Sequence, residues 1–503
     1  MNRFCLLLLL FLAGCTQLVQ PPNIIFILAD DLGYGDLGCY GQEKIETPNI
    51  DDLARQGMRF TQHYAGSPVC APSRCVLMTG KHTGHAFIRG NHEWGERGEV
   101  WNYQKAVDDP NLEGQYPIPE NTVTVARLLQ DAGYKTALVG KWGLGGPLTH
   151  AIPTKQGFDF FFGYNCQRQA HTYYPKHLWK NEEKVWLNNE LYVPGTPLPE
   201  GANPDDPQSY AHFSQPDYSP DVMFDEILNF VENNRDEPFF LYWATPIPHV
   251  PLQAPQAWVD YYVAKFGDEE PYLGQQGYCP SRYPHATFAA MVSYLDEQVG
   301  LLIKKLKELD LYENTLIIFT SDNGAGIGGG SDAEWFDSAK PFISQQGRIK
   351  GTVYEGGIRV PMIASWPGTI KAGSQTDHLS VFYDVLPTLC HLTGVDAPDD
   401  IDGISFLPRL LRKSQKQHDY LYWEFPAYGG QQAVRMGDWK AIRRDILSGN
   451  TEIELFNLAE DIQEQTNVAA EHPEILQKME EILRQEHEPS SIERFHMPAL
   501  GDR

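Results

Sequence analysis

NIIFILADD, residues 23–31, predicts a buried β-strand that ends in two acidic residues. The run up to Ala29 is apolar and rich in branched side chains, without the alternation of a half-exposed strand. Such a run is typical of a parallel strand that is covered on both faces. Ligands of parallel sheets bind beyond the carboxyl ends of the strands, so Asp30 and Asp31 are candidate ligand-binding residues.

Three later segments have the same form, an apolar run followed by polar residues. They are 136–139 before Gly140-Lys141, 239–244 before Pro248-His249, and 316–320 before Asp322-Asn323. Helical periodicity is found at 122–132, 288–309 and 381–392. Strands that alternate with helices predict an α/β fold with a largely parallel sheet.

Other parts of the chain have a different texture. Residues 149–215 and 258–284 are rich in aromatic residues, Pro and Asn and lack clear periodicity, which predicts long loops over the site. After Lys413 come short strand-like pieces at 420–424, 432–436, 440–443 and 454–456, and then an amphipathic helix at 474–485. We therefore expect a catalytic domain over 23–413 and a smaller antiparallel-sheet subdomain over 414–503.

The first 14 residues have the pattern of a bacterial lipoprotein signal peptide. Arg3 precedes an apolar run from Cys5 to Ala13, which is shorter than the about 20 residues of a membrane-spanning helix. Residues 12–15, LAGC, resemble a lipobox, which makes Cys15 the candidate lipidated residue and residues 15–22 a tether. An ordinary signal peptide with a chance cysteine is the alternative. We expect an exported bacterial lipoprotein in the periplasm or outer membrane, with the lipid as its only membrane contact.

The overall charge limits the choice of partners. The chain has 40 Lys and Arg against 66 Asp and Glu, a formal charge of −26. Nucleic acids are bound through a surplus of basic residues, so we expect no nucleic-acid partner. Hydrophobic residues make up 42% of the chain, which is enough for a packed core.

Two of the strand ends predict a metal site. Asp30, Asp31, Asp322 and Asn323 offer four hard oxygen ligands, and adjacent carboxylates repel each other unless a cation holds them. Oxygen ligands favour Ca²⁺ or Mg²⁺ over zinc. The alternative for each Asp alone is a helix cap or a turn.

Residues 67–80, SPVCAPSRCVLMTG, predict a reactive cysteine at a helix N-terminus. Pro72 suits the first turn of a helix, where its missing N–H does no harm. Cys70 would then face free amides that stabilise negative charge, and Arg74, one turn on, could hold an anion there. These features point to an activated cysteine beside an anion site. A buried structural cysteine is the alternative.

The segment CAPSR, residues 70–74, resembles the Cys-x-Pro-Ser-Arg signature of type I sulfatases, in the alkaline-phosphatase-like superfamily. The resemblance covers most of the chain. It includes Thr79-Gly80, Gly140-Lys141-Trp142, Pro248-His249, Ser321-Asp322-Asn323-Gly324, Lys350-Gly351 and residues 355–361, EGGIRVP. It implies an alkaline-phosphatase-like α/β domain with a small C-terminal sheet, and a sulfuric ester hydrolase.

The resemblance also implies roles for individual residues. A maturase partner oxidises Cys70 to formylglycine, whose hydrated aldehyde attacks sulfur. The four oxygen residues at the strand ends hold one calcium ion. Arg74 orients the modified residue, Lys141 and Lys350 bind sulfate oxygens, and His249 protonates or polarises the leaving alcohol. Cations and a helix N-terminus would stabilise the charge that develops on the sulfate, and a neutral leaving alcohol needs a proton donor.

The chain departs from the family pattern at one position. Many sulfatases have Gly-Lys-Trp-His, but Gly143 stands in place of that histidine. The residue that replaces it is left open between His171, His82 and His85. His171, Arg168 and His85 are also candidate substrate-binding residues.

The segment 163–171, GYNCQRQAH, looks like that of bacterial sulfatases acting on host or algal glycans. We expect an exo-acting carbohydrate sulfatase whose substrate is a sulfated oligosaccharide or monosaccharide, with galactose or N-acetylgalactosamine 6-sulfate favoured. The acidic background disfavours a long sulfated polymer and favours one sulfate on a short glycan or chain end. Alternatives are an arylsulfatase, a phosphatase or phosphodiesterase of the same superfamily, and a non-catalytic glycan-binding lipoprotein.

Overall fold

The computed structural model describes residues 21–503, so the predicted signal peptide and Cys15 lie outside the described residues. The large domain is built on one eleven-stranded sheet. At its centre, β1 (Asn23–Ala29) lies parallel between β8 (Thr315–Ser321) and β7 (Phe239–Ala244). β3 (Lys135–Lys141) pairs in parallel with the other side of β7. The four strands predicted as buried and parallel are therefore neighbours.

The rest of the sheet is mixed, with β4 parallel to β3 and both β10 and β11 parallel to β2. Its order is β10-β2-β9-β8-β1-β7-β3-β4-β5-β6, and β11 also pairs with β2. β9 runs antiparallel to both β8 and β2, and β5 runs antiparallel to β4 and β6. The bounds are β2 Met58–Tyr64, β4 Phe160–Tyr164, β5 His177–Lys180, β6 Glu183–Trp186, β9 Arg359–Ser365, β10 Ser374–Thr376 and β11 Ser380–Val381.

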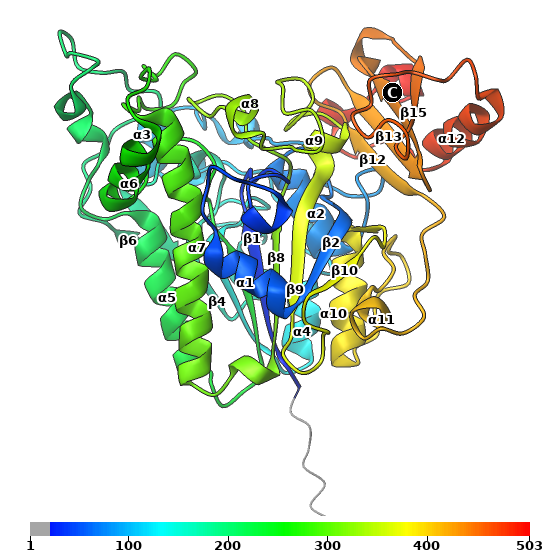
Figure 1. The fold of residues 1–503 in the computed structure, drawn as a ribbon, viewed down its shortest axis with the longest axis horizontal. Helices are drawn as coiled ribbons and strands as arrows, with labels where there is room; N and C mark the ends of the chain where they lie inside the picture. The colour runs from blue at the N-terminus through cyan, green and yellow to red at the C-terminus, as the bar shows by residue number, and fades with distance from the viewer. Residues whose placement is uncertain (1–20) are drawn as a thin grey trace, which may run out of the picture.

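Helices cover both faces of this sheet (Figure 1). Alternate residues of β1 enter two different cores, with Ile25 and Ile27 on one face and Ile24 and Phe26 on the other. The first face is covered by α1 (Pro48–Gln56), α5 (Ser219–Asn233), α6 (Gln256–Phe266) and α7 (Pro284–Glu308). The second is covered by α2 (Cys70–Thr79), α4 (Val125–Asp131), α10 (Val385–Thr393) and α11 (Leu407–Leu410). Short helices α3 (Tyr103–Asp108), α8 (Ala333–Phe336) and α9 (Glu355–Ile358) lie in connections.

The C-terminal part forms a second, four-stranded antiparallel sheet, in orange at the upper right of Figure 1. Its strands are β12 (Leu421–Phe425), β13 (Gln431–Met436), β14 (Trp439–Arg444) and β15 (Ile453–Asn457), and α12 (Pro473–Gln485) packs on it. This agrees with the predicted antiparallel subdomain, while the boundary at 413/414 stays a prediction. Among residues 21–503, no helix combines the length and apolar character that a membrane crossing requires.

The prediction of long loops was wrong in two places. Residues 149–215 contain β4, β5 and β6, and the segment 258–284 begins with the last nine residues of α6, 258–266. Two of the aromatic residues there belong to the core, since Phe161 and Phe162 of β4 are buried on opposite faces of the sheet. Short strands near a sheet edge give too few residues for a periodic pattern to emerge.

Candidate active site

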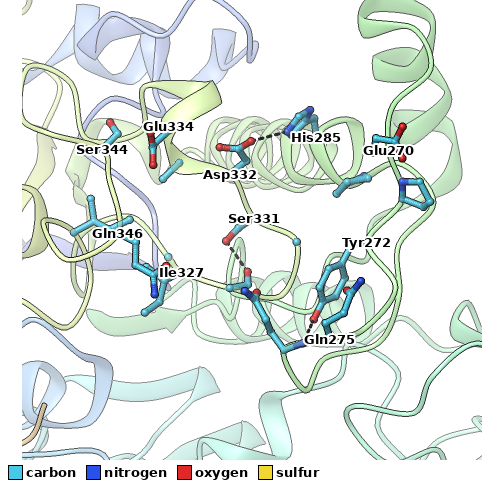
Figure 2. Close-up of a pocket in the computed structure, with 18 residues that line it drawn as sticks. Glu270, Tyr272, Gln275, His285, Ile327, Ser331, Asp332, Glu334, Ser344 and Gln346 are labelled. Atoms are coloured by element: carbon cyan, nitrogen blue, oxygen red, sulfur yellow. Dashed lines mark hydrogen bonds and ion pairs between the residues drawn. The ribbon is translucent and has the colours of Figure 1, made fainter.

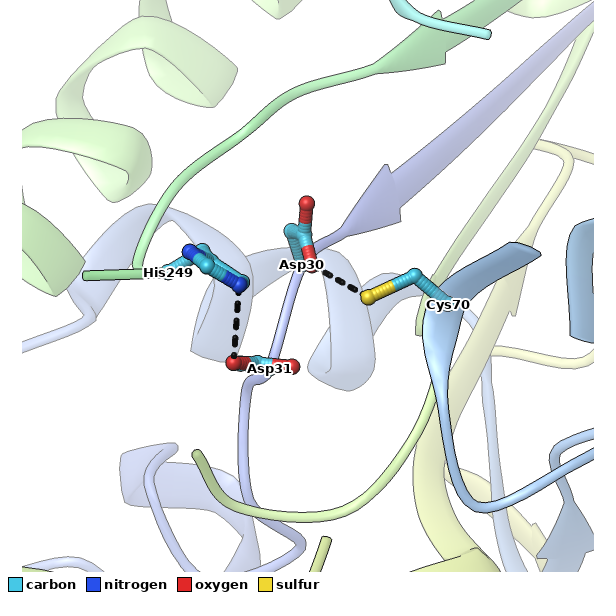
Figure 3. A group of neighbouring side chains, drawn as sticks. All are labelled: Asp30, Asp31, Cys70 and His249. Atoms are coloured by element: carbon cyan, nitrogen blue, oxygen red, sulfur yellow. Dashed lines mark hydrogen bonds and ion pairs between the residues drawn. The ribbon is translucent and has the colours of Figure 1, made fainter. Parts of the chain in front are cut away.

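Polar side chains from all four central strands converge at one edge of the sheet. Asp30 and Asp31 follow β1, Asp322 and Asn323 follow β8, and Lys141 is the last residue of β3. The register pairs Ala29 with Ser321, which sets the two acidic segments side by side. Figure 3 shows Asp30, Asp31, Cys70 and His249 facing one another, and one ligand atom of each lies within 4.8 Å of the others.

The residues at the ends of β1 and β8 form an oxygen-rich group. Asn323 Nδ2 donates to Asp31 Oδ1 at 2.8 Å, and the Asp31 amide donates to Asp322 Oδ1 at 3.2 Å. The Oδ1 atom of Asn323 is buried and has no hydrogen-bond partner among the described residues. Because buried oxygens need partners, this orphan acceptor and the neighbouring carboxylates fit a hard divalent cation.

Three basic side chains balance the carboxylates. Lys141 Nζ lies 2.5 Å from Asp30 Oδ2, Lys350 Nζ lies 2.7 Å from Asp31 Oδ2, and Arg74 pairs with Asp322. Burial alone would raise the pKa of Asp30, but the charges of Lys141, His249 and Arg74 hold it well below its usual range. Arg74, Lys141 and Lys350 can therefore present positive charge to an anion that binds beside them.

Cys70 is the first residue of α2 and is only 1% exposed. Its Sγ lies 3.4 Å from Asp30 Oδ1. Burial and then the Asp30 charge raise the pKa of the thiol far above its usual value. In the unmodified side chain, burial and the Asp30 carboxylate therefore act against the helix N-terminus, which favours the thiolate.

The described contacts of His249 fix its orientation. Its Nδ1 lies 2.5 Å from the Val250 carbonyl oxygen, which can only accept, so the proton sits on Nδ1. The other ring nitrogen, Nε2, faces Asp31 Oδ2 at 3.6 Å. Burial, with Lys350 nearby, lowers the pKa of His249 to about 4. The Tyr173 hydroxyl donates to the His249 carbonyl at 2.7 Å and steadies this segment.

The structure brings His171 to the site. Its ring stacks on that of His249, with centroids 5.5 Å apart and planes 13° apart. Burial lowers the pKa of His171, and the charges of Lys141 and Lys350 act on it in the same direction. Three histidines were considered as replacements for the family histidine that is absent at Gly143. Of these, His171 is the one whose described contacts lie among the site residues.

Two predicted substrate contacts have other partners. Arg168 lies over the Trp101 ring, 5.0 Å from its centroid, and donates to the Val100 carbonyl at 3.2 Å. His85 contacts Asp402, with Nδ1 2.9 Å from Oδ1. His82 pairs with Glu486, just after α12. The described contacts of these residues do not include the residues at the ends of β1 and β8.

Sequence reasoning missed two residues of the site. Gly143 has a φ of 85°, and a Cβ there would lie 3.1 Å from Gln167 Nε2, which is buried without a partner among the described residues. Gln167 therefore faces the position where the family pattern has a histidine. The Tyr278 ring contacts both histidine rings, 5.3 Å from His171 and 6.1 Å from His249. Gln167 lies in the segment 163–171, where only Arg168 and His171 were assigned roles, and Tyr278 lies in none of the quoted motifs.

Comparisons of the sequence with known proteins give consistent matches. The family model described as Sulfatase matches residues 22–395, and one described as N-sulphoglucosamine sulphohydrolase, C-terminal, matches residues 349–489. N-acetylgalactosamine-6-sulfatase of Sus scrofa is 33% identical, over 88% of this chain and 75% of its own. Arylsulfatase A of Homo sapiens is 34% identical, over 86% and 77%. N-acetylgalactosamine-6-O-sulfatase of Bacteroides thetaiotaomicron is 29% identical, over 94% and 96%.

Solved structures share the fold. Ps i-CgsB, also solved in complex with k-i-k-neocarrahexaose, has a TM-score of 0.73 and 28% identity over 93% of this chain and 94% of its own. A structure from work on glycosaminoglycan metabolism by Bacteroides thetaiotaomicron has a TM-score of 0.68 and 28% identity, over 93% and 99%. The large mixed sheet with its second antiparallel sheet confirms the predicted fold class.

Proposed function

Because the chain belongs to the sulfatase family, whose members are sulfuric ester hydrolases, we propose that it is an exo-acting carbohydrate sulfatase. The favoured substrate is galactose or N-acetylgalactosamine 6-sulfate at the end of a glycan. Relatives named N-acetylgalactosamine-6-sulfatase from mammals and from Bacteroides thetaiotaomicron support this choice. The observation that carries the proposed sulfatase activity is the group of buried cations and oxygen ligands around Cys70, at the carboxyl ends of the central strands.

We propose that Cys70 is converted to formylglycine, as is general in the sulfatase family. The modified residue supplies a hydrated aldehyde as the nucleophile toward sulfur. The unmodified thiol is a poor candidate, because burial and Asp30 raise its pKa. Since Cys70 is 1% exposed in the folded chain, a maturase would have to reach it before folding is complete.

We propose that Asp30, Asp31, Asp322 and Asn323 hold one calcium ion. The ion supplies positive charge beside the sulfate when it is bound. The all-oxygen donor set and the unpaired, buried Oδ1 of Asn323 support this assignment.

The chain's own side chains have separate tasks in this proposal. Lys141 and Lys350 hold the sulfate oxygens, where fixed cations stabilise the charge that develops in the transition state. Arg74 orients residue 70 from the same helix. His249 acts in its doubly protonated form, in which Nδ1–H stays on the Val250 carbonyl and Nε2–H donates its proton to the leaving oxygen. His171, stacked on His249, is the proposed replacement for the family histidine absent at Gly143.

The proposed location is outside the cytoplasm. It rests on the sequence pattern alone: a signal peptide over 1–14, lipidation at Cys15, and a tether to the periplasmic or outer-membrane surface. The lipid would be the only membrane contact.

Hydrolysis of aryl sulfates is a second candidate function. It is favoured by the 34% identity to human arylsulfatase A, over 86% of this chain. The two candidates differ in the leaving group, so a substrate panel separates them.

The test combines maturation and turnover. The full chain is expressed with a formylglycine-generating maturase, the peptide holding Cys70 is weighed by mass spectrometry, and sulfate release is measured on 6-sulfated galactose, 6-sulfated N-acetylgalactosamine, nitrophenyl sulfate and a phosphate ester. We expect the aldehyde mass and release from a 6-sulfated sugar, both absent in Cys70→Ala. An unmodified Cys70 in protein that still releases sulfate, or turnover of the phosphate ester alone, would overturn the proposal.

A further inference from the structure

A groove of about 670 Å³ adjoins the site (Figure 2). Its walls come from the segment 270–276, the glycine-rich loop 326–332 that follows β8, and the start of α8. Gly326 belongs to the wall and also donates its amide to the Asp31 carbonyl at 3.1 Å. Ile349, another wall residue, directly precedes Lys350. The groove therefore begins where the proposed sulfate pocket ends.

The groove is acidic, unlike the pocket beside it. Three carboxylates line it, those of Glu270, Asp332 and Glu334, and none of the described lining residues is Lys or Arg. The lining imidazole, His285, already faces Asp332 at 3.1 Å and Glu269 at 3.2 Å.

The basic residues that flank the lining residues in sequence are engaged elsewhere. Arg282, two residues before Pro284, pairs with Asp268 at 2.6 Å. Arg348 donates to the carbonyl oxygens of Gln463 and Glu464, at 2.6 and 2.8 Å. Lys350 is paired with Asp31 inside the proposed sulfate pocket. A second anionic group bound in the groove would therefore meet carboxylates without a compensating cation.

The hydrogen-bonding groups of the groove suit hydroxyls. The carboxylates of Glu270 and Glu334 make no hydrogen bond within the described chain, and a carboxylate can only accept. Gln276 and Gln346 add side-chain amides that both donate and accept, and the Tyr272 ring adds an apolar face. A neutral sugar brings hydroxyl donors to these acceptors, whereas a sulfate or carboxylate would bring further acceptors and like charge.

We infer that this groove binds the sugar next to the sulfated one and selects a neutral residue there. The inference rests on the proposed function and narrows its substrate class. The substrate is a glycan end with one sulfate, whose neighbouring sugar carries neither sulfate nor carboxylate.

The test compares two disaccharides that share a 6-sulfated galactose and differ in the neighbouring sugar, which is neutral in one and carries a sulfate or carboxylate in the other. For the wild-type enzyme we expect kcat/KM to favour the neutral neighbour by about tenfold or more. Neutralising both free carboxylates, in Glu270→Gln with Glu334→Gln, should reduce this ratio about fivefold, since it removes two like charges from the groove. The exposed pair Glu308→Gln with Glu313→Gln makes the same change in net charge at the opposite end of β8 from the loop 326–332, since Glu308 ends α7 and Glu313 precedes β8, and should leave the ratio unchanged.

Several outcomes would overturn the inference. One is a kcat/KM on the disaccharide with the anionic neighbour that equals or exceeds the value on the neutral one. Another is a ratio of the two values that changes equally in the groove variant and the control variant. Turnover of 6-sulfated galactose alone reports on the proposed function, so activity without discrimination defeats only the groove. If no ester is cleaved, calorimetric titration of Cys70→Ala with both disaccharides decides, because tighter binding of the neutral one supports the groove and equal binding refutes it.

Discussion

Arg74 holds Asp322 through two hydrogen bonds to one carboxylate oxygen, from Nε at 3.1 Å and from Nη2 at 2.8 Å. Both side chains are fully buried. Lysine would place a single point charge there and could not reproduce the fixed planar donors. We predict that Arg74→Lys lowers the free energy of unfolding by about 3 kcal/mol, as measured by urea denaturation, and abolishes sulfate release.

The exposed pair of Arg55 and Asp52 supplies the control, since its side chains are 71% and 42% exposed. Arg55→Lys should change stability by less than about 0.5 kcal/mol. Equal effects of the two substitutions would mean that the buried pair contributes no more than a surface pair.

The oxygen group at the ends of β1 and β8 predicts a metal-dependent stability. Chelation with EGTA should lower the midpoint of thermal unfolding, and calcium should restore it, because an ion that binds only the folded state at 100 times its Kd adds about 2.7 kcal/mol. Zinc at the same concentration should restore less, since the donors are all oxygens.

Asn323→Leu removes the buried, unpaired Oδ1 and should shift the calcium titration of thermal stability to at least about tenfold higher concentration. The same calcium dependence in Asn323→Leu and wild type would exclude this oxygen as a ligand. An unchanged midpoint in EGTA, with no calcium found by elemental analysis, would refute the metal site altogether.

The strands and their polar ends could be predicted because burial on both faces selects unbroken apolar runs, and parallel strands present their carboxyl ends at one edge. The order of the strands could not, because β9 takes its antiparallel place between β8 and β2 through contacts that local sequence does not encode. The same limit applies within the site. Lys141 and His249 followed from strand ends, whereas Gln167 and Tyr278 reach the site from irregular segments whose path depends on tertiary packing.

His249 and His171 lie stacked, yet the proposal gives them different tasks, and leaving-group dependence separates these tasks. His249→Ala should reduce kcat about 100-fold on a sugar sulfate, whose alcohol needs a proton, and much less on nitrophenyl sulfate, whose phenolate leaves unaided. His171→Ala should reduce kcat on both substrates alike, because its proposed partner is residue 70 and not the leaving oxygen.

Gln167→Leu serves as the comparison for both histidine variants, because it changes a buried side chain of the same site to which no role in the reaction is assigned. Activity of His171→Ala equal to wild type on both substrates would remove His171 from the mechanism. A loss confined to the sugar sulfate would place it with the leaving group instead.

The contact between His418 and Asp384 predicts a pH-dependent stability. His418 Nε2 lies 2.7 Å from Asp384 Oδ1, joining the segment before β12 to the start of α10. Burial alone would lower the pKa of His418, but Asp384 raises it above its ordinary value of 6.5, with Lys416 opposing and Asp402 adding to this effect. Because the folded-state pKa is the higher one, the contribution is complete below the unfolded pKa and is lost as the pH rises through the folded pKa.

We therefore expect His418→Gln to destabilise the protein by about 1.5 kcal/mol near pH 6, where wild type has the charge-assisted bond, and by less near pH 8.5. Thermal unfolding of both proteins at the two pH values measures the difference. His391→Gln, at an exposed histidine that contacts the Ser405 hydroxyl, should show no such dependence. If His418→Gln costs the same at both pH values, the neutral imidazole makes the contact, and Asp384 contributes a hydrogen bond without a charge.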